Sequence, residues 1–165
     1  MKTKRLTFCE LLTAIALTIF MVEAQLPPPI PIPGMKLGLA NVVTVFAMFA
    51  LGPRDTLLIL LSRVILGSLF AGGSTLPYSL AGALACYLLM LLLHKLLTPK
   101  QLWVCGALGA VAHNLGQMAM AIAIARTPQL IVYLPVLLLV GIPAGGLTGL
   151  LAQLLLARIG SYIKK

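Results

Sequence analysis

Long apolar runs fill this sequence and constrain its fold more than any other feature. Of its 165 residues, 61% are hydrophobic and only 9% are charged, whereas a soluble domain carries about 25% charged residues to cover its surface. The solvent around this chain must therefore be lipid. At about 20 apolar residues per span, the chain has room for roughly six transmembrane helices and none for a soluble catalytic domain. Large enzymes and ATPases are thereby excluded.

We predict an all-α integral membrane protein with a single transmembrane domain, residues 1–165. The apolar runs between charges, prolines and glycines predict helices near 7–26, 37–52, 55–71, 76–97, 101–125 and 129–158. The second run spans only about 24 Å, so it needs flanking residues or a locally thinner bilayer to cross. The last run is long, and Gly141, Pro143, Gly145 and Gly146 allow it to kink.

The basic residues predict the orientation of this bundle. Most of them fall at helix ends on one side, in the even-numbered loops and at both termini: Lys2, Lys4, Arg5, Arg54, Lys95, Lys100, Arg158, Lys164 and Lys165. Only Lys36 and Arg126 fall on the other side, and Arg63 lies inside a helix. The positive-inside rule therefore places both termini in the cytoplasm and the chain in the cell (inner, cytoplasmic) membrane as a multi-pass protein. The net charge of +9 serves this orientation, and no nucleic-acid partner is expected.

The N-terminus is open to a second interpretation. A basic start, an apolar stretch and the small residues around Glu23 outline a secretory signal with a cleavage site. An uncleaved first helix is favoured, because the apolar stretch is long, Glu10 interrupts its start, and a proline-rich segment follows it.

That segment is the outer loop 27–35, in which closely spaced prolines fix an extended path that neither helix can continue. It is either a rigid linker or a lid over an outward-facing pocket.

Polar side chains inside apolar helices are costly and mark a site, a pathway or a partner. The candidate substrate-binding residues gather in the middle and outer half of the predicted bundle: Glu23, Lys36, Asn41, Arg63, His113, Asn114 and Gln117. They would form a capture site open to the outside, for a small anionic or zwitterionic ligand with an apolar portion. The same residues can instead hold the bundle together through ion pairs and interhelical hydrogen bonds.

Metal and cofactor chemistry is not indicated. Cys9, Cys86 and Cys105 lie in apolar runs without metal-ligand spacing, and His113 has no second ligand nearby in the sequence. We expect no catalytic residue, no metal and no cofactor.

Small residues predict close helix contacts. Gly141, Gly145 and Gly149 form overlapping GxxxG repeats, and residues 106–116 carry two similar repeats. Packing within the bundle is the first explanation. On the first helix, Ala14 and Thr18 belong to a small-residue surface that could receive another subunit.

Several segments together resemble a known family. They are Glu23-Ala-Gln-Leu-Pro, Pro-Ile-Pro-Gly-Met-Lys-Leu-Gly-Leu-Ala-Asn41, Gly52-Pro-Arg-Asp55, Arg63, Gly67-Ser-Leu-Phe70 and His113-Asn-Leu-Gly-Gln117. Over essentially the whole chain the sequence resembles heptaprenyl diphosphate synthase component I, also called the Gx transporter family.

The resemblance implies two alternative functions. The first is a membrane accessory subunit that works with a soluble polyprenyl synthase in isoprenoid quinone biosynthesis. The second follows from similarity to the substrate-binding S components of energy-coupling-factor (ECF) transporters, which pair with a transmembrane coupling protein and two ATPases. We predict this second function, capture of a ligand for uptake. Where S components carry Ala-x-x-x-Ala, this chain has Ala14-x-x-x-Thr18.

The acidic residues exclude synthase catalysis by this chain alone. Prenyl transfer needs aspartate-rich clusters to hold magnesium ions on a diphosphate. The sequence has three acidic residues, Glu10, Glu23 and Asp55, so at most it is a non-catalytic subunit.

Overall fold

The computed structural model describes residues 2–25, 38–71 and 73–163, and every regular element in them is helical. Six α-helices and two short 3-10 helices follow one another: α1 Lys2–Ala24, α2 Asn41–Ala50, α3 Pro53–Phe70, α4 Leu76–Leu96, η1 Pro99–Gln101, α5 Leu102–Ala125, η2 Pro128–Tyr133 and α6 Leu134–Ile163. The predicted all-helical class is confirmed. The expected loop 27–35 lies outside the described residues.

Four of these helices are long and apolar enough to cross a membrane: Thr3–Ala24, Leu76–Leu96, Pro99–Ala125 and Pro128–Gly160, counting the 3-10 turns with α5 and α6. Large apolar side chains on their surfaces are exposed, such as Leu88 at 61% and Leu139 at 75%. In a soluble protein such a surface would aggregate, whereas here it faces lipid. The protein is therefore a multi-pass membrane protein.

The second predicted span is shorter than the sequence suggested. The apolar run predicts a helix over 37–52, but α2 has only ten residues, Asn41–Ala50. This is about 15 Å of helix, half the thickness of a bilayer core. The turn before it is held by short-range bonds, such as Asn41 N–H to Gly38 O at 2.9 Å. This helix does not span a bilayer by itself. Six spans therefore stay a prediction, and four are supported by length and composition.

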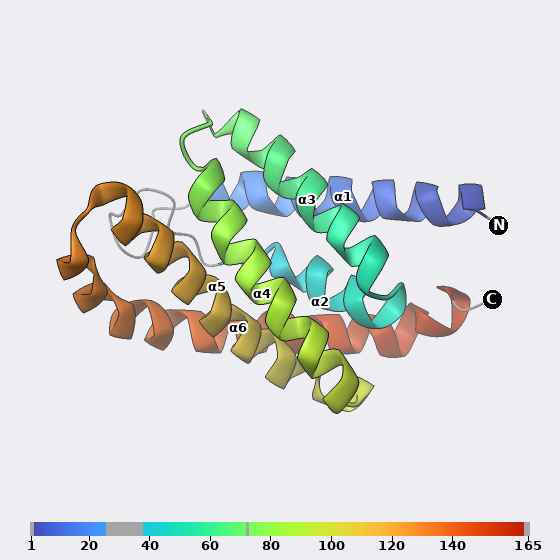
Figure 1. Ribbon diagram of the computed structural model, residues 1–165. Helices are drawn as coiled ribbons and strands as arrows, with labels where there is room; N and C mark the ends of the chain where they lie inside the picture. Colours follow the sequence, from blue (N-terminus) through green and yellow to red (C-terminus); the bar gives the residue numbers. More distant parts are fainter. Residues whose placement is uncertain (1, 26–37, 72, 164–165) are drawn as a thin grey trace.

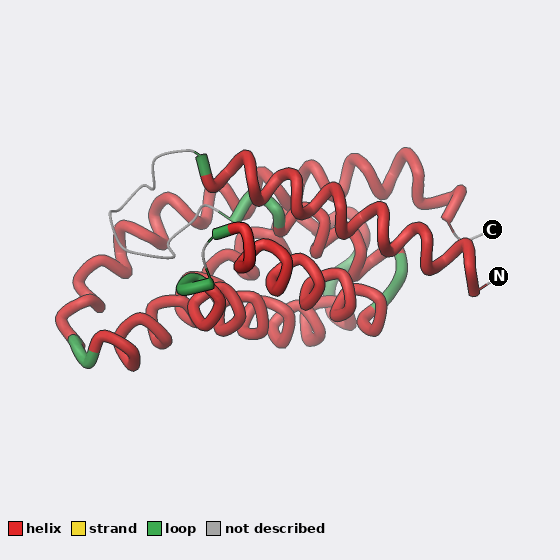
Figure 2. The backbone as a smooth tube through the Cα atoms, turned by 90° about the horizontal axis from the view of Figure 1, so that it is seen from above, coloured by secondary structure: helices red, strands yellow, loops and turns green. Residues whose placement is uncertain are grey.

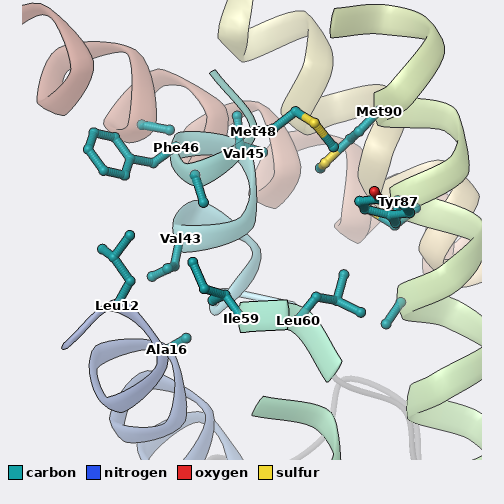
Figure 3. Close-up of a cluster of buried hydrophobic side chains, with 14 of the residues drawn as sticks. Leu12, Ala16, Val43, Val45, Phe46, Met48, Ile59, Leu60, Tyr87 and Met90 are labelled. Carbon is teal, nitrogen blue, oxygen red and sulfur yellow. The ribbon is translucent and has the colours of Figure 1, made fainter. Parts of the chain in front are cut away.

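The short α2 forms the middle of the bundle. Figure 3 shows its residues Val43, Phe46 and Met48 among side chains of α1, α3 and α4. Val45, Ala47 and Met48 are fully buried, and α2 also contacts α5 and α6. A helix that is apolar on all sides is stable only when other helices surround it. The core therefore lies around α2, with α1 and α3–α6 as its wall.

Helices α5 and α6 meet backbone to backbone. A Cβ atom added at Gly106 would collide with the carbonyl oxygen of Gly145, and one added at Gly145 would lie 2.5 Å from the oxygen of Gly106. A Cβ atom added at Gly149 would likewise collide with the carbonyl oxygen of Leu102. Small residues permit this approach, which gains van der Waals contact that lipid cannot supply. The GxxxG residues of α6 thus pack within the bundle.

The two chain ends lie together (Figures 1 and 2). In Figure 1 the α2–α3 and α4–α5 junctions lie towards that same end, while the α3–α4 and α5–α6 junctions lie at the other. We call the half near the termini the terminal half and the other the cavity half. Gly52, with φ +94°, makes the tight α2–α3 turn, where Pro53 begins α3.

Candidate functional site

A small cavity lies in the cavity half, bounded by five helices and the turn before α2. Its apolar wall consists of Phe20 on α1, Gly38 in the turn and Val64 on α3. Its polar wall carries six side chains: Glu23, Asn41, Arg63, Ser79, His113 and Gln117. The cavity measures about 20 Å³, which is room for about one water molecule. A cavity of this size has room for water and not for an organic ligand.

Among the described residues that line the cavity, Arg63 is the only lysine or arginine. It lies about three turns into α3 and is 5% exposed. Its Nη2 donates to Asn41 Oδ1 at 3.5 Å, which is at the outer limit of a hydrogen bond. Its buried Nε has no hydrogen-bond partner in the described part of the chain. The guanidinium is thus held in place but poorly satisfied.

Glu23 is buried near the end of α1 and is directed at the start of α2. One carboxylate oxygen accepts the backbone N–H of Gly38, and the other accepts that of Leu39 at 3.0 Å. These N–H groups belong to the turn that leads into α2, where a helix start leaves donors unsatisfied and favours negative charge. Glu23 therefore fastens α1 to α2 and lies beside Asn41, the residue that contacts Arg63.

Helices α4 and α5 close the cavity on the opposite side. His113 and Gln117 are 8% and 3% exposed and share a face of α5, as their four-residue spacing predicts. They fit there because α4 carries Gly82: a Cβ at this position would lie 2.6 Å from Gln117 Cγ and 3.0 Å from His113 Cε1. His113 Nδ1 is buried without a hydrogen-bond partner among the described residues. The imidazole therefore has spare hydrogen-bonding capacity.

Asn114 does not line the cavity with its neighbours. Its Nδ2 donates to Leu137 O of α6 at 3.0 Å, and it lies against Gly141, where a Cβ would collide with Nδ2. Here the structure matches the alternative interpretation, an interhelical hydrogen bond. Lys36, the other expected site cation, lies outside the described residues.

The surface expected to receive a partner is exposed. Ala14 and Thr18 both face outward on α1, and the Thr18 hydroxyl donates to Ala14 O at 2.9 Å. This internal bond satisfies the hydroxyl and leaves a smooth helix surface.

Sequence reasoning missed two features. Ser79 and Phe20 line the cavity, but a serine or a phenylalanine in an apolar helix gives no distinct signal. In the terminal half, Arg5 of α1 pairs with Asp55 of α3 and also donates from Nη2 to Leu51 O at 3.1 Å. Opposite charges fifty positions apart do not indicate contact until the helices are placed.

The described residues contain no group of three or more His, Cys, Asp or Glu that could hold a metal ion. The carboxylates are separated: Glu10 is exposed on α1, Asp55 pairs with Arg5, and Glu23 fastens α2. The arrangement can bind and orient a ligand through hydrogen bonds and one positive charge.

The fold and the cavity together define a class: a multi-pass helical membrane protein with a buried polar site in one half of its bundle. Within this class, residues 12–155 match the family model for heptaprenyl diphosphate synthase component I. The chain belongs to that family, as its sequence motifs suggested. Searches of curated proteins and of solved structures gave no match.

Proposed function

We propose that this protein is the membrane-embedded, non-catalytic accessory subunit of a polyprenyl diphosphate synthase. The observation that carries the proposal is the family match over residues 12–155, nearly the whole chain. The separated carboxylates support the non-catalytic part, since magnesium-dependent prenyl transfer needs several acidic ligands in one place. The catalytic subunit would be a soluble partner.

The terminal half offers a surface for this partner. Five basic side chains exposed on helices or helix ends there are Lys4, Arg54, Lys95, Lys100 and Arg158. With the termini in the cytoplasm, these charges face the compartment of a soluble synthase. They attract an acidic protein surface or the anionic headgroups beside it.

Co-purification tests the proposal. The full chain, tagged after Lys165 and extracted in mild detergent, should retain a soluble polyprenyl synthase identified by mass spectrometry. The double variant Lys95→Glu/Lys100→Glu should lose it, because both charges of the α4–α5 junction are reversed. Arg126→Glu, at the opposite end, is the matched control and should retain it. Recovery without a synthase, at normal membrane levels, contradicts the proposal.

A second candidate is favoured by a different observation. The cavity lies in the half away from the termini, the side from which an uptake system would capture its substrate, and Ala14 and Thr18 leave a small-residue surface on α1. The protein would then be an S-component-like capture subunit. Retention of a transmembrane coupling protein with an ATPase pair supports this candidate. Ala14→Leu/Thr18→Leu should abolish that retention, and Ile15→Leu on the same exposed helix should not.

A further inference from the structure

We propose that Arg63 is the anchor of an anion site that takes a carboxylate or phosphate group attached to an apolar body. The inference depends on neither proposed function, because it concerns which ligand the cavity binds rather than which protein the chain joins. It stands on three observations. Arg63 has few hydrogen-bond partners, the carboxylate of Glu23 is already hydrogen-bonded to backbone N–H groups, and the cavity wall combines polar and apolar side chains.

The first observation is the hydrogen bonding of Arg63. A guanidinium has five N–H donors in a rigid fork. Here one 3.5 Å bond to Asn41 connects it to the described residues, and Nε is buried without a partner. The described residues also place no carboxylate within ion-pair distance of it. A buried charge without a counter-charge is strongly unfavourable, so an anion that reaches it is bound tightly.

The second observation concerns Glu23, the acid that lines the same cavity. Both of its oxygens accept backbone N–H groups of the turn before α2. The carboxylate is therefore committed to fastening α2, and it compensates Arg63 only at a distance. This arrangement leaves the fork of Arg63 available while its position stays fixed through Asn41.

The third observation is the cavity wall. His113, 8% exposed, presents a buried Nδ1 without a partner in the described chain, and Ser79 contributes a hydroxyl. The Ser79 hydroxyl can donate to an anion, and the imidazole can donate from Nδ1 when the ring proton is on that nitrogen. Phe20 and Val64 add apolar surface for the rest of the ligand. Since the closed cavity holds about one water, an anionic group enters as the walls separate.

Two sources share this chemistry, a free amphipathic anion and a lipid headgroup. The full-length protein is reconstituted in phosphatidylcholine nanodiscs and titrated calorimetrically with hexyl phosphate, hexanoate and hexylammonium, which share one alkyl chain. We expect saturable binding of at least one of the two anions and none of the cation. A second preparation contains phosphatidic acid, and native mass spectrometry measures its retention. Retention that depends on Arg63 supports the site with a lipid as the ligand. Absence of both anion binding and lipid retention overturns the proposal.

Variants of Arg63 separate a ligand site from a structural role. Arg63→Ala should weaken anion binding by about 30-fold or more. Arg63→Lys should recover little of it, because lysine keeps the charge but loses the fork. Arg54→Ala removes the same side chain from an exposed position on the same helix and should bind normally. If Arg63→Ala binds like wild type, the proposal fails. It fails equally if Arg63→Ala/Glu23→Ala binds normally, since Arg63 would then serve only to balance Glu23.

A variant that keeps Arg63 covers the case in which Arg63→Ala does not fold. Ser79→Leu fills the cavity from α4 and should abolish binding of hexyl phosphate in a folded protein. In parallel, Arg63 of wild type is mapped by mass spectrometry after phenylglyoxal treatment. Hexyl phosphate should protect it and hexylammonium should not. Normal binding by folded Ser79→Leu, or no protection by the anion, overturns the proposal.

Discussion

Each half of the bundle holds an arginine, and the two differ in exposure and in hydrogen bonding. In the terminal half, the Arg5 side chain is 59% exposed and still has Asp55 and a backbone carbonyl as partners. In the cavity half, Arg63 is 5% exposed, and one long bond to Asn41 connects it to the described residues. Arg5 is thus better paired than Arg63, although water around Arg5 already stabilises its charge. The hydrogen bonds of Arg63 within the described residues therefore compensate its burial poorly.

The halves also use glycine differently. In the terminal half, Gly106 lets the α5 backbone touch α6, so that the space is filled by main chain. In the cavity half, Gly82 leaves space beside His113 and Gln117. A Cβ at Gly82 would also lie 2.9 Å from the His113 carbonyl oxygen, so this glycine serves helix packing as well as the shape of the cavity.

Gly106→Ala should lower the free energy of unfolding by about 2–3 kcal/mol, because its new methyl group meets the α6 backbone, which cannot move aside as a side chain can. Unfolding by SDS in mixed micelles measures the loss. Gly146→Ala is the matched control, since a Cβ there has nothing within 4 Å. It should be neutral or gain up to about 1 kcal/mol of helix stability. Equal effects at the two positions would contradict the backbone contact.

Arg63→Met should raise the free energy of unfolding by about 1–2 kcal/mol while abolishing anion binding, because an apolar side chain of similar length replaces a poorly paired buried charge. The same SDS titration and the calorimetric assay measure both quantities. Arg54→Met, at an exposed position on the same helix, controls for the exchange of arginine for methionine. A large destabilisation by Arg63→Met would show that the charge holds the bundle together.

How far the sequence predicted this molecule depends on the kind of signal. Polar groups in an apolar run are costly wherever they point, so the sequence alone predicts that Arg63, Glu23 and Asn41 avoid lipid, and the structure places all three on one cavity. Asn114 was placed with them, although it faces α6. Adjacent residues on a helix point in different directions, and only the positions of neighbouring helices decide which direction is the cavity.

Helix ends were predicted less well, for a related reason. Helix α1 begins at Lys2 rather than near residue 7, because an apolar run marks the part in lipid, whereas lysine and arginine continue a helix into water. Helix α2 is shorter than its apolar run, since residues 38–40 are apolar but are held in a turn that Glu23 fastens. Hydropathy reports burial in lipid or protein, and it does not report where a helix stops.

Glu23→Gln should lower the stability of the protein and strengthen its binding of anions. An amide offers one acceptor oxygen where the carboxylate offers two, so the start of α2 loses a charge-assisted bond and the protein about 1 kcal/mol of stability. Removal of the negative charge beside the cavity should strengthen binding of hexyl phosphate several-fold. Glu10→Gln, an exposed acid on the same helix, is the control and should change neither. Weaker anion binding in Glu23→Gln would place Glu23 among the ligand-binding groups.

The smallest effect is expected for the Arg5–Asp55 pair. Arg5→Ala removes the ion pair and the bond to Leu51 O, while Asp55→Ala removes the pair and an acid from the first turn of α3, where negative charge is favourable. Neither single variant therefore measures the pair itself. A double-mutant cycle isolates it, because the other contributions cancel. With Arg5 largely exposed, we expect a coupling of about 0.5 kcal/mol, which should decline as salt shortens the Debye length from about 10 Å at 0.1 M to about 3 Å at 1 M.

Salt dependence is the decisive part of that measurement. A coupling that falls with salt places the pair in contact with water, as its exposure indicates, and preserves the contrast with Arg63. A coupling well above 1 kcal/mol that is insensitive to salt would mean that the terminal half shields its charges as the cavity half does. The poor pairing of Arg63 would then no longer distinguish the two halves, and only the binding experiments could assign Arg63 to a ligand.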